Sequence, residues 1–170
     1  MMIRCCNNTD FEQIQAIIND GSSAYKGVIP DDCWAQPYMS KDELRQELAA
    51  GVTFWGCETN GILQGVMGLQ PVQDVTLIRH AYVLSSAQRQ GIGASLLAHL
   101  RPLAKTPILI GTWADAHWAI RFYEKHGFRL LGRQQAQGLM ERYWMISPRQ
   151  KEVSVVLAEI TARSFFEGTS

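Results

Sequence analysis

The sequence has no excess of charge of either sign. Its 16 lysines and arginines balance 16 aspartates and glutamates, so the formal net charge is zero. Proteins that bind nucleic acid over a broad surface need a basic field to attract phosphates. This chain has no such field, and we expect no nucleic-acid partner. Long hydrophobic runs are also missing: none follows the N-terminal Met1-Met2-Ile3-Arg4, and we expect neither a signal peptide nor a membrane partner.

Cysteine is scarce, and its spacing fits no metal site. The four cysteines are Cys5, Cys6, Cys33 and Cys57, and none of the intervals between them matches a metal-ligand pattern. Adjacent cysteines on a strand would point to opposite faces of the sheet. Buried or half-buried thiols in a reducing compartment are the simplest interpretation, with a catalytic thiol as a weaker alternative. We therefore expect a cytoplasmic protein without a bound metal.

The length and composition are typical of one compact domain. A chain of 170 residues with 46% hydrophobic residues buries about 70% of its surface on folding. Neither repeats nor low-complexity tracts divide it. We predict a single domain over residues 1–158 and a C-terminal tail over residues 159–170.

Hydrophobic periodicity and turn residues predict alternating strands and helices. The expected strands cover residues 2–6, 53–58, 62–70, 75–83, 107–112, 128–132 and 153–157. The expected helices cover residues 10–19, 41–50, 92–100 and 116–126, with further helical spacing over 139–144 that Pro148 ends. Asn60-Gly61 is a strong hairpin signal. This order predicts an α/β fold with a mixed central sheet and helices on both faces.

Two glycines, Gly91 and Gly93, lie where an apolar strand gives way to a helical pattern. Glycine permits a tight turn and a close approach of a ligand to the main chain. The N–H groups of the first helical turn have no partner within the helix, and the helix dipole favours an anion there. The sequence therefore predicts a phosphate site, with Arg89 as an additional cation. A plain strand-to-helix turn is the alternative.

Two common phosphate motifs do not fit this loop. The Walker loop requires Lys-Ser or Lys-Thr after its last glycine, whereas Ala94-Ser95 follows here. The dinucleotide fingerprint requires a third glycine and an acid about 20 residues further on. The next strand, Ile108-Leu109-Ile110-Gly111-Thr112, ends without one.

A second informative segment is the helix predicted over residues 116–126. Asp115 is a candidate N-cap, and Ala116, Ala119, Ile120 and Tyr123 recur at helical spacing. Lys125 and His126 suit the negative end of the helix dipole, and Gly127 suits a left-handed stop.

Together, the two segments resemble the GNAT superfamily of N-acetyltransferases. Gln88-Arg89-Gln90-Gly91-Ile92-Gly93 is similar to the pyrophosphate loop of that family. Ala119-Ile120-Arg121-Phe122-Tyr123-Glu124-Lys125-His126-Gly127-Phe128 is similar to its Ala-x-x-Phe-Tyr-x-x-x-Gly-Phe helix. With the strands that carry them, the motifs cover residues 75–132. The resemblance implies a mostly antiparallel sheet in which the strands at 77–83 and 107–112 splay apart, with the pantetheine arm of acetyl-CoA in the gap.

The resemblance also implies a set of cofactor-binding residues. These are Tyr82, Val83, Leu84, Ser85, Gln88, Arg89, Gln90, Gly91, Ile92, Gly93, Ala94, Ala116 and Phe122. One position departs from the family, since Ala116 stands where many members have an asparagine that helps to hold the cofactor. That departure removes a side-chain contact, for which Asp115 or His117 are candidate substitutes.

The activity implied by the resemblance is transfer of an acetyl group from acetyl-CoA to a primary amine by direct attack. The leaving thiolate needs a proton, and Tyr123 occupies the tyrosine position of the family helix. The alternative for Tyr123 is packing in the core. A backbone N–H near Val83 or Leu84 is the expected donor to the oxyanion.

The sequence offers three candidates for the general base. The family often uses a glutamate on the central strands, but Thr76-Leu77-Ile78-Arg79-His80-Ala81-Tyr82 contains no acid. His80 is the best candidate because the ordinary pKa of histidine, near 6.5, suits the task. His117 is the second candidate, and proton loss to water is the third interpretation.

Aromatic residues are expected to shape the acceptor pocket. They are Tyr25, Trp34, Tyr38, Trp55, Tyr143 and Trp144. Ring faces suit an apolar or cationic acceptor, although packing in the core explains the same residues equally well. The expected partner is a small-molecule amine or a peptide, and a homodimer is left open. The competing functions are an acyl-CoA-binding module without turnover and a nucleotide-binding regulator.

Overall fold

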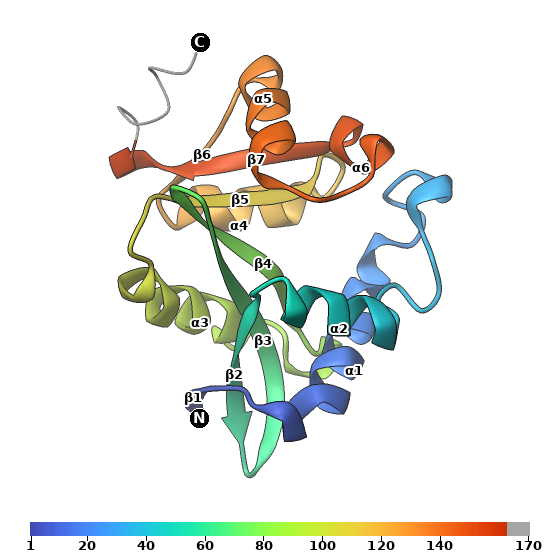
Figure 1. The fold of residues 1–170 in the computed structure, drawn as a ribbon. Helices are drawn as coiled ribbons and strands as arrows, with labels where there is room; N and C mark the ends of the chain where they lie inside the picture. The colour runs from blue at the N-terminus through green and yellow to red at the C-terminus, as the bar shows by residue number, and fades with distance from the viewer. Residues whose placement is uncertain (163–170) are drawn as a thin grey trace.

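The computed structural model describes residues 1–162 and shows one seven-stranded sheet (Figure 1). The strand order is β1-β2-β3-β4-β5-β7-β6. The strands are β1 (Met2–Cys5), β2 (Thr53–Thr59), β3 (Ile62–Val72), β4 (Val75–Val83), β5 (Ile108–Trp113), β6 (Phe128–Leu130) and β7 (Ser154–Glu159). All neighbours pair antiparallel except β4 and β5, which pair parallel. The predicted mixed, mostly antiparallel sheet is confirmed.

Helices cover both faces of this sheet. The α-helices are α1 (Phe11–Gly21), α2 (Lys41–Ala49), α3 (Ile92–Leu100), α4 (His117–Lys125), α5 (Arg133–Tyr143) and α6 (Pro148–Glu152). Short 3₁₀ turns are η1 (Asn8–Asp10), η2 (Ser22–Tyr25), η3 (Asp31–Cys33), η4 (Ser85–Ala87), η5 (Arg101–Leu103) and η6 (Ile160–Ala162). None of the helices in the described part of the chain is long and apolar enough to cross a membrane.

Alternation along the strands assigns each helix to a face. Ile78 and Ile110 point into the cluster formed with α3 and α4. Leu77 and Leu109, one residue earlier on each strand, point into the cluster formed with α5. Because successive strand residues face opposite sides, α3 and α4 lie on one face and α5 on the other. In the same way, Phe54 packs with α1 and α2 on the side that α3 does not cover.

The central feature of the sheet is the short contact between β4 and β5. Their pairing is limited to three positions, from Thr76↔Ile108 to Ile78↔Ile110. Beyond Ile78 both strands continue, but β5 pairs only with β7 on its other side. The two strands then diverge, and β4 runs obliquely below β5 in Figure 1. The splay that the family resemblance implies is therefore present.

A bulge in β4 occurs just after this point. Gly68 lies opposite Arg79 and Val66 opposite Tyr82, so two residues of β4, His80 and Ala81, face one residue of β3. His80 has φ = 54°, which places it in the left-handed region. A bulge of this kind bends its strand and changes the direction of a side chain, and here it occurs at the mouth of the splay.

Several element boundaries differ from the sequence prediction. The helix predicted around residues 139–144 is α5, and it starts at Arg133. Pro148 begins the further helix α6 instead of ending a helix, with Ser147 as its N-cap. Ala116, not Asp115, is the N-cap of α4. β7 extends through Glu159, which pairs with Phe128, so this strand ends two residues later than the predicted end at residue 157. Most of the predicted tail, residues 163–170, lies outside the described residues.

Candidate active site

The glycine loop presents an uncapped helix end. Gly91 is the N-cap of α3 with φ = 77°, and no side chain caps this end of the helix. Arg89 is also left-handed, with φ = 63°. The buried Ile92 side chain fixes the loop to the core while Gly91 stays exposed. The first N–H groups of α3 are therefore directed away from the core without a side-chain partner, as an anion site requires.

The two sequence motifs meet in space. A Cβ built on Gly93 would lie 3.5 Å from the ring of Phe122. The start of α3 and the exposed side of α4 therefore form two walls of one surface. The remaining predicted loop residues, Gln88 and Gln90, are exposed beside it.

Fewer main-chain N–H groups at the end of β4 are free than the sequence suggests. Leu84 donates its N–H to the carbonyl of Gln64 at 2.9 Å. Ser85 donates its N–H to Oδ2 of Asp20 at 2.6 Å, and its hydroxyl to Oδ1 at 3.1 Å. These bonds correct the expectation that the N–H groups of Leu84 and Ser85 are available to a cofactor.

The main-chain N–H of Val83 stays free on this edge. Backbone N–H groups of neighbouring strand residues point to opposite sides. Since Leu84 donates to β3, the N–H of Val83 points to the side where β5 has diverged. Its carbonyl accepts a long bond of 3.5 Å from Nε2 of Gln88. Val83 is thus the predicted backbone donor that the structure leaves accessible.

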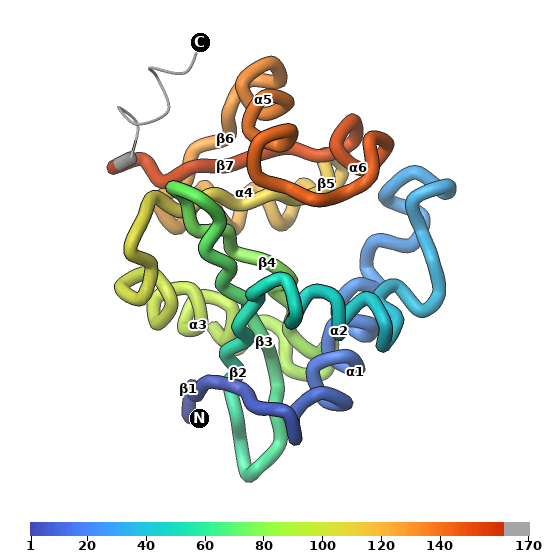
Figure 2. Tube along the Cα trace, in the orientation of Figure 1, coloured from blue at the N-terminus to red at the C-terminus, as the bar shows by residue number. Residues whose placement is uncertain are grey.

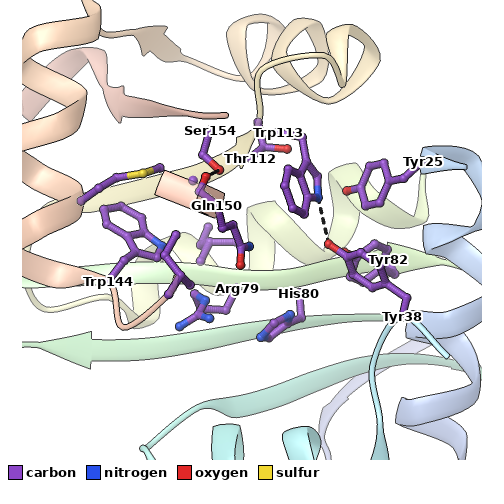
Figure 3. Close-up of a pocket in the computed structure, with 14 residues that line it drawn as sticks. Tyr25, Tyr38, Arg79, His80, Tyr82, Thr112, Trp113, Trp144, Gln150 and Ser154 are labelled. Atoms are coloured by element: carbon purple, nitrogen blue, oxygen red, sulfur yellow. Dashed lines mark hydrogen bonds between the residues drawn. The ribbon is translucent and has the colours of Figure 1, made fainter. Parts of the chain in front are cut away.

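A pocket lies in the splay between β4 and β5 (Figure 3). One wall comes from β4 and includes Arg79 and His80, and the opposite wall comes from β5 and includes Thr112 and Trp113. Trp144, Gln150 and Ser154 contribute from the C-terminal part. The segment between α1 and α2 contributes Tyr25 and Tyr38 to the lining. Figure 2 shows that this segment passes beside α6. An ion pair of 2.9 Å between Asp32 and Arg149 joins the two.

Three tyrosines gather at one end of this pocket. Tyr25 is the centre, with ring centroids 5.6 Å from Tyr38, 6.2 Å from Tyr82 and 6.4 Å from Trp113. Tyr38 accepts a hydrogen bond of 2.8 Å from Nε1 of Trp113. Burial raises the pKa of all three phenols above the ordinary value. They therefore remain protonated at neutral pH and can donate hydrogen bonds.

Only some of the predicted aromatic residues belong to this pocket. Tyr25, Tyr38 and Trp144 line it, and Trp34 stacks on Tyr38 with centroids 5.8 Å apart. Trp55 lies elsewhere and packs on His99 at 5.1 Å. Tyr143 also lies outside the lining, where its hydroxyl donates to Asp74 at 2.6 Å.

Tyr123 belongs to the opposite, α3–α4 face of the sheet. Its side chain is 6% exposed and packs edge-on against Phe122 and Phe128. None of the described residues forms a hydrogen bond with its hydroxyl. In this part of the chain every fully buried side-chain oxygen has a hydrogen-bond partner, so a hydroxyl without a partner is not fully buried. The hydroxyl therefore keeps a small exposed surface. Burial raises the pKa of this phenol well above its ordinary value.

The candidate bases are in different surroundings. His80 lines the pocket, and its Nε2 lies 2.8 Å from Oε2 of Glu47. Burial lowers the pKa of His80 below its ordinary value, so the ring is unprotonated at neutral pH. His117 is exposed at the first position of α4 and is not part of the pocket.

Ala116 does not offer the contact expected of its position. It is completely buried and packs with Tyr25, Ile29 and Trp113. Its methyl group therefore faces the core, in agreement with the expectation that this position offers the cofactor no side-chain contact. The main-chain N–H of Ala116 is also used, since it donates to the carbonyl of Trp113 at 3.0 Å.

Within residues 1–162, no group of acidic, histidine or cysteine residues is arranged to hold a metal ion. Burial raises the pKa of Cys6 to about 12 and that of Cys57 in the same direction. Both thiols therefore stay protonated at neutral pH.

Sequence reasoning missed several residues of this site. Glu47 and Asp20 lie 33 and 65 positions from their partners His80 and Ser85, and no local pattern marks them. Thr112 and Ser154 enter the pocket only because β5 and β7 pair beside the splay.

Several solved structures with a similar fold are named as acetyltransferases. A GNAT-family acetyltransferase from Staphylococcus aureus Mu50 gives a TM-score of 0.68 at 20% identity, covering 93% of this chain and 97% of that chain. PaiA N-acetyltransferase from Thermoplasma acidophilum, in complex with coenzyme A, gives 0.69 at 16% identity, covering 94% and 99%. A GNAT-family acetyltransferase from Elizabethkingia anophelis with acetyl-CoA bound gives 0.61 at 20% identity, covering 93% and 96%.

The TM-scores show that the fold is shared, but at identities of 16–20% they show nothing beyond the fold. Assignment to a family needs a match of the sequence itself. A search of curated proteins found no match. A family model described as an acetyltransferase (GNAT) domain matches residues 13–145, which is more than half of the chain. The chain therefore belongs to the GNAT acetyltransferase family.

Proposed function

We propose that this chain is an acetyl-CoA-dependent N-acetyltransferase that acetylates a primary amine by direct attack. The observation that carries the proposal is the junction of the uncapped start of α3 with the free edge of β4 at Val83. This junction can hold a diphosphate and an amide-bearing arm side by side. Two of the three solved structures named above contain coenzyme A or acetyl-CoA.

The residues present fit such a cofactor. The N–H groups of Ile92, Gly93 and Ala94 would hold the diphosphate, because helix N-termini bind anions. The exposed Arg89 adds a cation beside them. The main chain of Val83 would pair with the pantetheine arm, as an edge strand pairs with an extended ligand. The cofactor supplies an activated thioester carbonyl.

The two faces of the sheet separate the two proton transfers. His80, in the pocket on the α5 face, takes a proton from the attacking amine. Tyr123, on the α3–α4 face, gives its proton to the departing thiolate. The N–H of Val83 donates to the oxyanion. The acceptor, a small amine or a peptide, occupies the pocket of tyrosines and Trp113, and a cytoplasmic location stays a prediction.

A binding module without turnover is the second candidate. Two observations favour it: Ala116 offers no side-chain contact, and β4 carries no carboxylate. The two candidates share the cofactor site and differ only in chemistry.

Calorimetry with acetyl-CoA, followed by a thiol-release assay against a panel of amines, separates the candidates. Tight binding with amine-dependent release of coenzyme A supports the transferase. Binding without release supports the module, and preference for ATP or NAD over acetyl-CoA would contradict both.

A further inference from the structure

Glu47, in the last turn of α2, reaches the ring of His80 from outside the pocket. Oε2 of Glu47 lies 2.8 Å from Nε2 of His80 and 3.1 Å from a terminal nitrogen of Arg79. Glu47 is not part of the pocket lining, whereas His80 is. The carboxylate therefore contacts the imidazole on the side away from the acceptor.

The charge of Glu47 decides which ring nitrogen carries the proton. Burial opposes ionisation, but the hydrogen bond to His80 and the charge of Arg79 outweigh it, and the pKa of Glu47 lies below its ordinary value. An ionised carboxylate only accepts hydrogen bonds. Nε2 of the neutral ring must therefore carry the hydrogen, which leaves the lone pair on Nδ1.

Nδ1 of His80 is available to a ligand. None of residues 1–162 forms a hydrogen bond with it. In the same part of the chain, every fully buried side-chain nitrogen has a hydrogen-bond partner. Nδ1 therefore keeps some exposed surface, and the side chain that carries it is 14% exposed and lines the pocket.

The backbone and a neighbouring ring hold the imidazole in this orientation. The left-handed φ of 54° at the bulge is an uncommon conformation for a residue other than glycine. Such conformations persist where the surrounding structure enforces them and concentrate at functional sites. The ring of Phe54 stacks on His80 with centroids 6.1 Å apart and an interplanar angle of 28°.

Three charged groups face His80 from the elements packed around it. Arg79 on the same strand disfavours the imidazolium, while Glu47 and Glu43 on α2 favour it. Glu47 is the only one of these that touches the ring. Loss of its charge would therefore lower the basicity of His80 and remove the partner that selects the tautomer.

We propose that Glu47 is a positioning residue that keeps the hydrogen of His80 on Nε2 and presents Nδ1 as the atom that accepts the proton of the amine. The inference rests on the proposed function. The nitrogen of the amine forms the bond to the acetyl carbon, and the carbon–sulfur bond breaks. The N–H proton moves to Nδ1, the thiolate takes a proton from Tyr123, and the imidazolium then loses its proton to water, which also reprotonates Tyr123.

A purely structural role for Glu47 is the competing explanation. Its contact with Arg79 joins α2 to β4, and loss of that contact would lower stability without changing the titration of His80. Nitrogen-15 spectra of the imidazole rings separate the two explanations because they report the tautomer directly. The signal of His80 is identified from its absence in His80→Asn.

The test compares Glu47→Gln with Glu43→Gln, a matched loss of one charge on the same helix. We expect the wild-type spectrum to show hydrogen on Nε2. Glu47→Gln should lower kcat by about 10-fold with little change in the acceptor KM, and should move the acid limb of the pH profile to lower pH. Glu43→Gln should leave kcat and the tautomer as they are. Glu47→Asp, which keeps the charge, should restore part of the lost kcat.

Hydrogen on Nδ1 in the wild type would overturn the proposal without any variant. So would an active Glu47→Gln protein with unchanged kcat and unchanged titration of His80. A wild-type protein that binds acetyl-CoA but acetylates no amine would instead contradict the proposed function. The nitrogen-15 spectrum tests the role of Glu47, and the thiol-release assay tests the proposed function. One result can therefore contradict its hypothesis while the other does not.

Discussion

Gly93 of α3 lies against the ring of Phe122 of α4. A Cβ atom built on Gly93 would lie 3.5 Å from the nearest ring atom, which is an ordinary van der Waals contact. The contact joins the glycine loop to the helix that also carries Tyr123. A ligand that binds its diphosphate at the start of α3 is thereby brought beside α4. The relationship explains why the two motifs occur together: each forms one side of the same site.

Gly91→Val should abolish detectable binding of acetyl-CoA. Gly91 has φ = 77°, a conformation that costs a residue with a side chain about 1–2 kcal/mol. A Cβ there would meet nothing within 4 Å, so the effect acts through the backbone of the loop and through the space for a diphosphate. Calorimetry measures the change in affinity.

Gly61→Val is the matched control for that variant. Gly61 has φ = 78° and equally open surroundings, but it lies at the tip of the β2–β3 hairpin. We expect a similar loss of stability with unchanged affinity for acetyl-CoA. Equal affinities of the two variants would mean that the diphosphate binds elsewhere.

Local signals explain what the sequence predicted correctly. A left-handed glycine at the start of α3 and the Asn60-Gly61 turn depend on neighbouring residues alone, and both are present. The start of α5 was missed because its first turn, Arg133-Gln134-Gln135, is polar and Gly132 provides no side-chain cap. Apolar spacing becomes visible only later in that helix.

Long-range contacts explain what the sequence could not predict. The amide of Ser85 belongs to a predicted cofactor segment, yet the carboxylate of Asp20 at the end of α1 occupies it. Glu47 meets His80 because α2 packs beside the bulge of β4. Such pairings depend on the assembled sheet, and a single sequence does not show which distant residues the assembly brings together.

Tyr123→Phe should lower kcat by about 10- to 100-fold while the affinity for acetyl-CoA is nearly kept. The substitution removes a hydroxyl that no described residue binds, so folding loses little. Burial holds the pKa of this phenol above 10, so its titration should produce no alkaline limb below that pH. Steady-state kinetics across pH check both statements.

Tyr143→Phe provides the contrast. It removes a phenol that donates to Asp74 at 2.6 Å outside the pocket, so stability should fall by about 1 kcal/mol and kcat should stay unchanged. An unchanged kcat in Tyr123→Phe as well would remove Tyr123 from the mechanism.

Gly111→Ala should raise the KM for the acceptor without weakening acetyl-CoA binding. A Cβ on Gly111 would lie 3.1 Å from three ring atoms of Trp144, and both residues line the pocket. The methyl would force that ring to move, which changes the shape of the lining that the acceptor would contact. Gly138→Ala on α5, where a Cβ meets nothing within 4 Å, should leave KM unchanged and stabilise the helix by up to about 1 kcal/mol. Equal KM values in both variants would place the acceptor elsewhere.

Folding stability should fall as the pH drops below the ordinary histidine value of 6.5, and His80 should account for part of the loss. Burial lowers the pKa of His80 in the folded state, and Arg79 acts in the same direction. Between 6.5 and the lowered value, the unfolded chain binds a proton that the folded chain does not, so stability increases with pH across that window. Glu47, whose pKa is also lowered, adds a second loss below 4.5.

His80→Asn isolates the first of these two windows, because asparagine tolerates the left-handed backbone at this position. Denaturant unfolding of both proteins from pH 7 to pH 5 measures the difference in free energy. The wild type should lose more stability than the variant over this range. Parallel curves of stability against pH would show that His80 keeps an ordinary pKa in the folded protein. If the pH profile of kcat then showed an acid limb below 6.5, the general base would have to be another group.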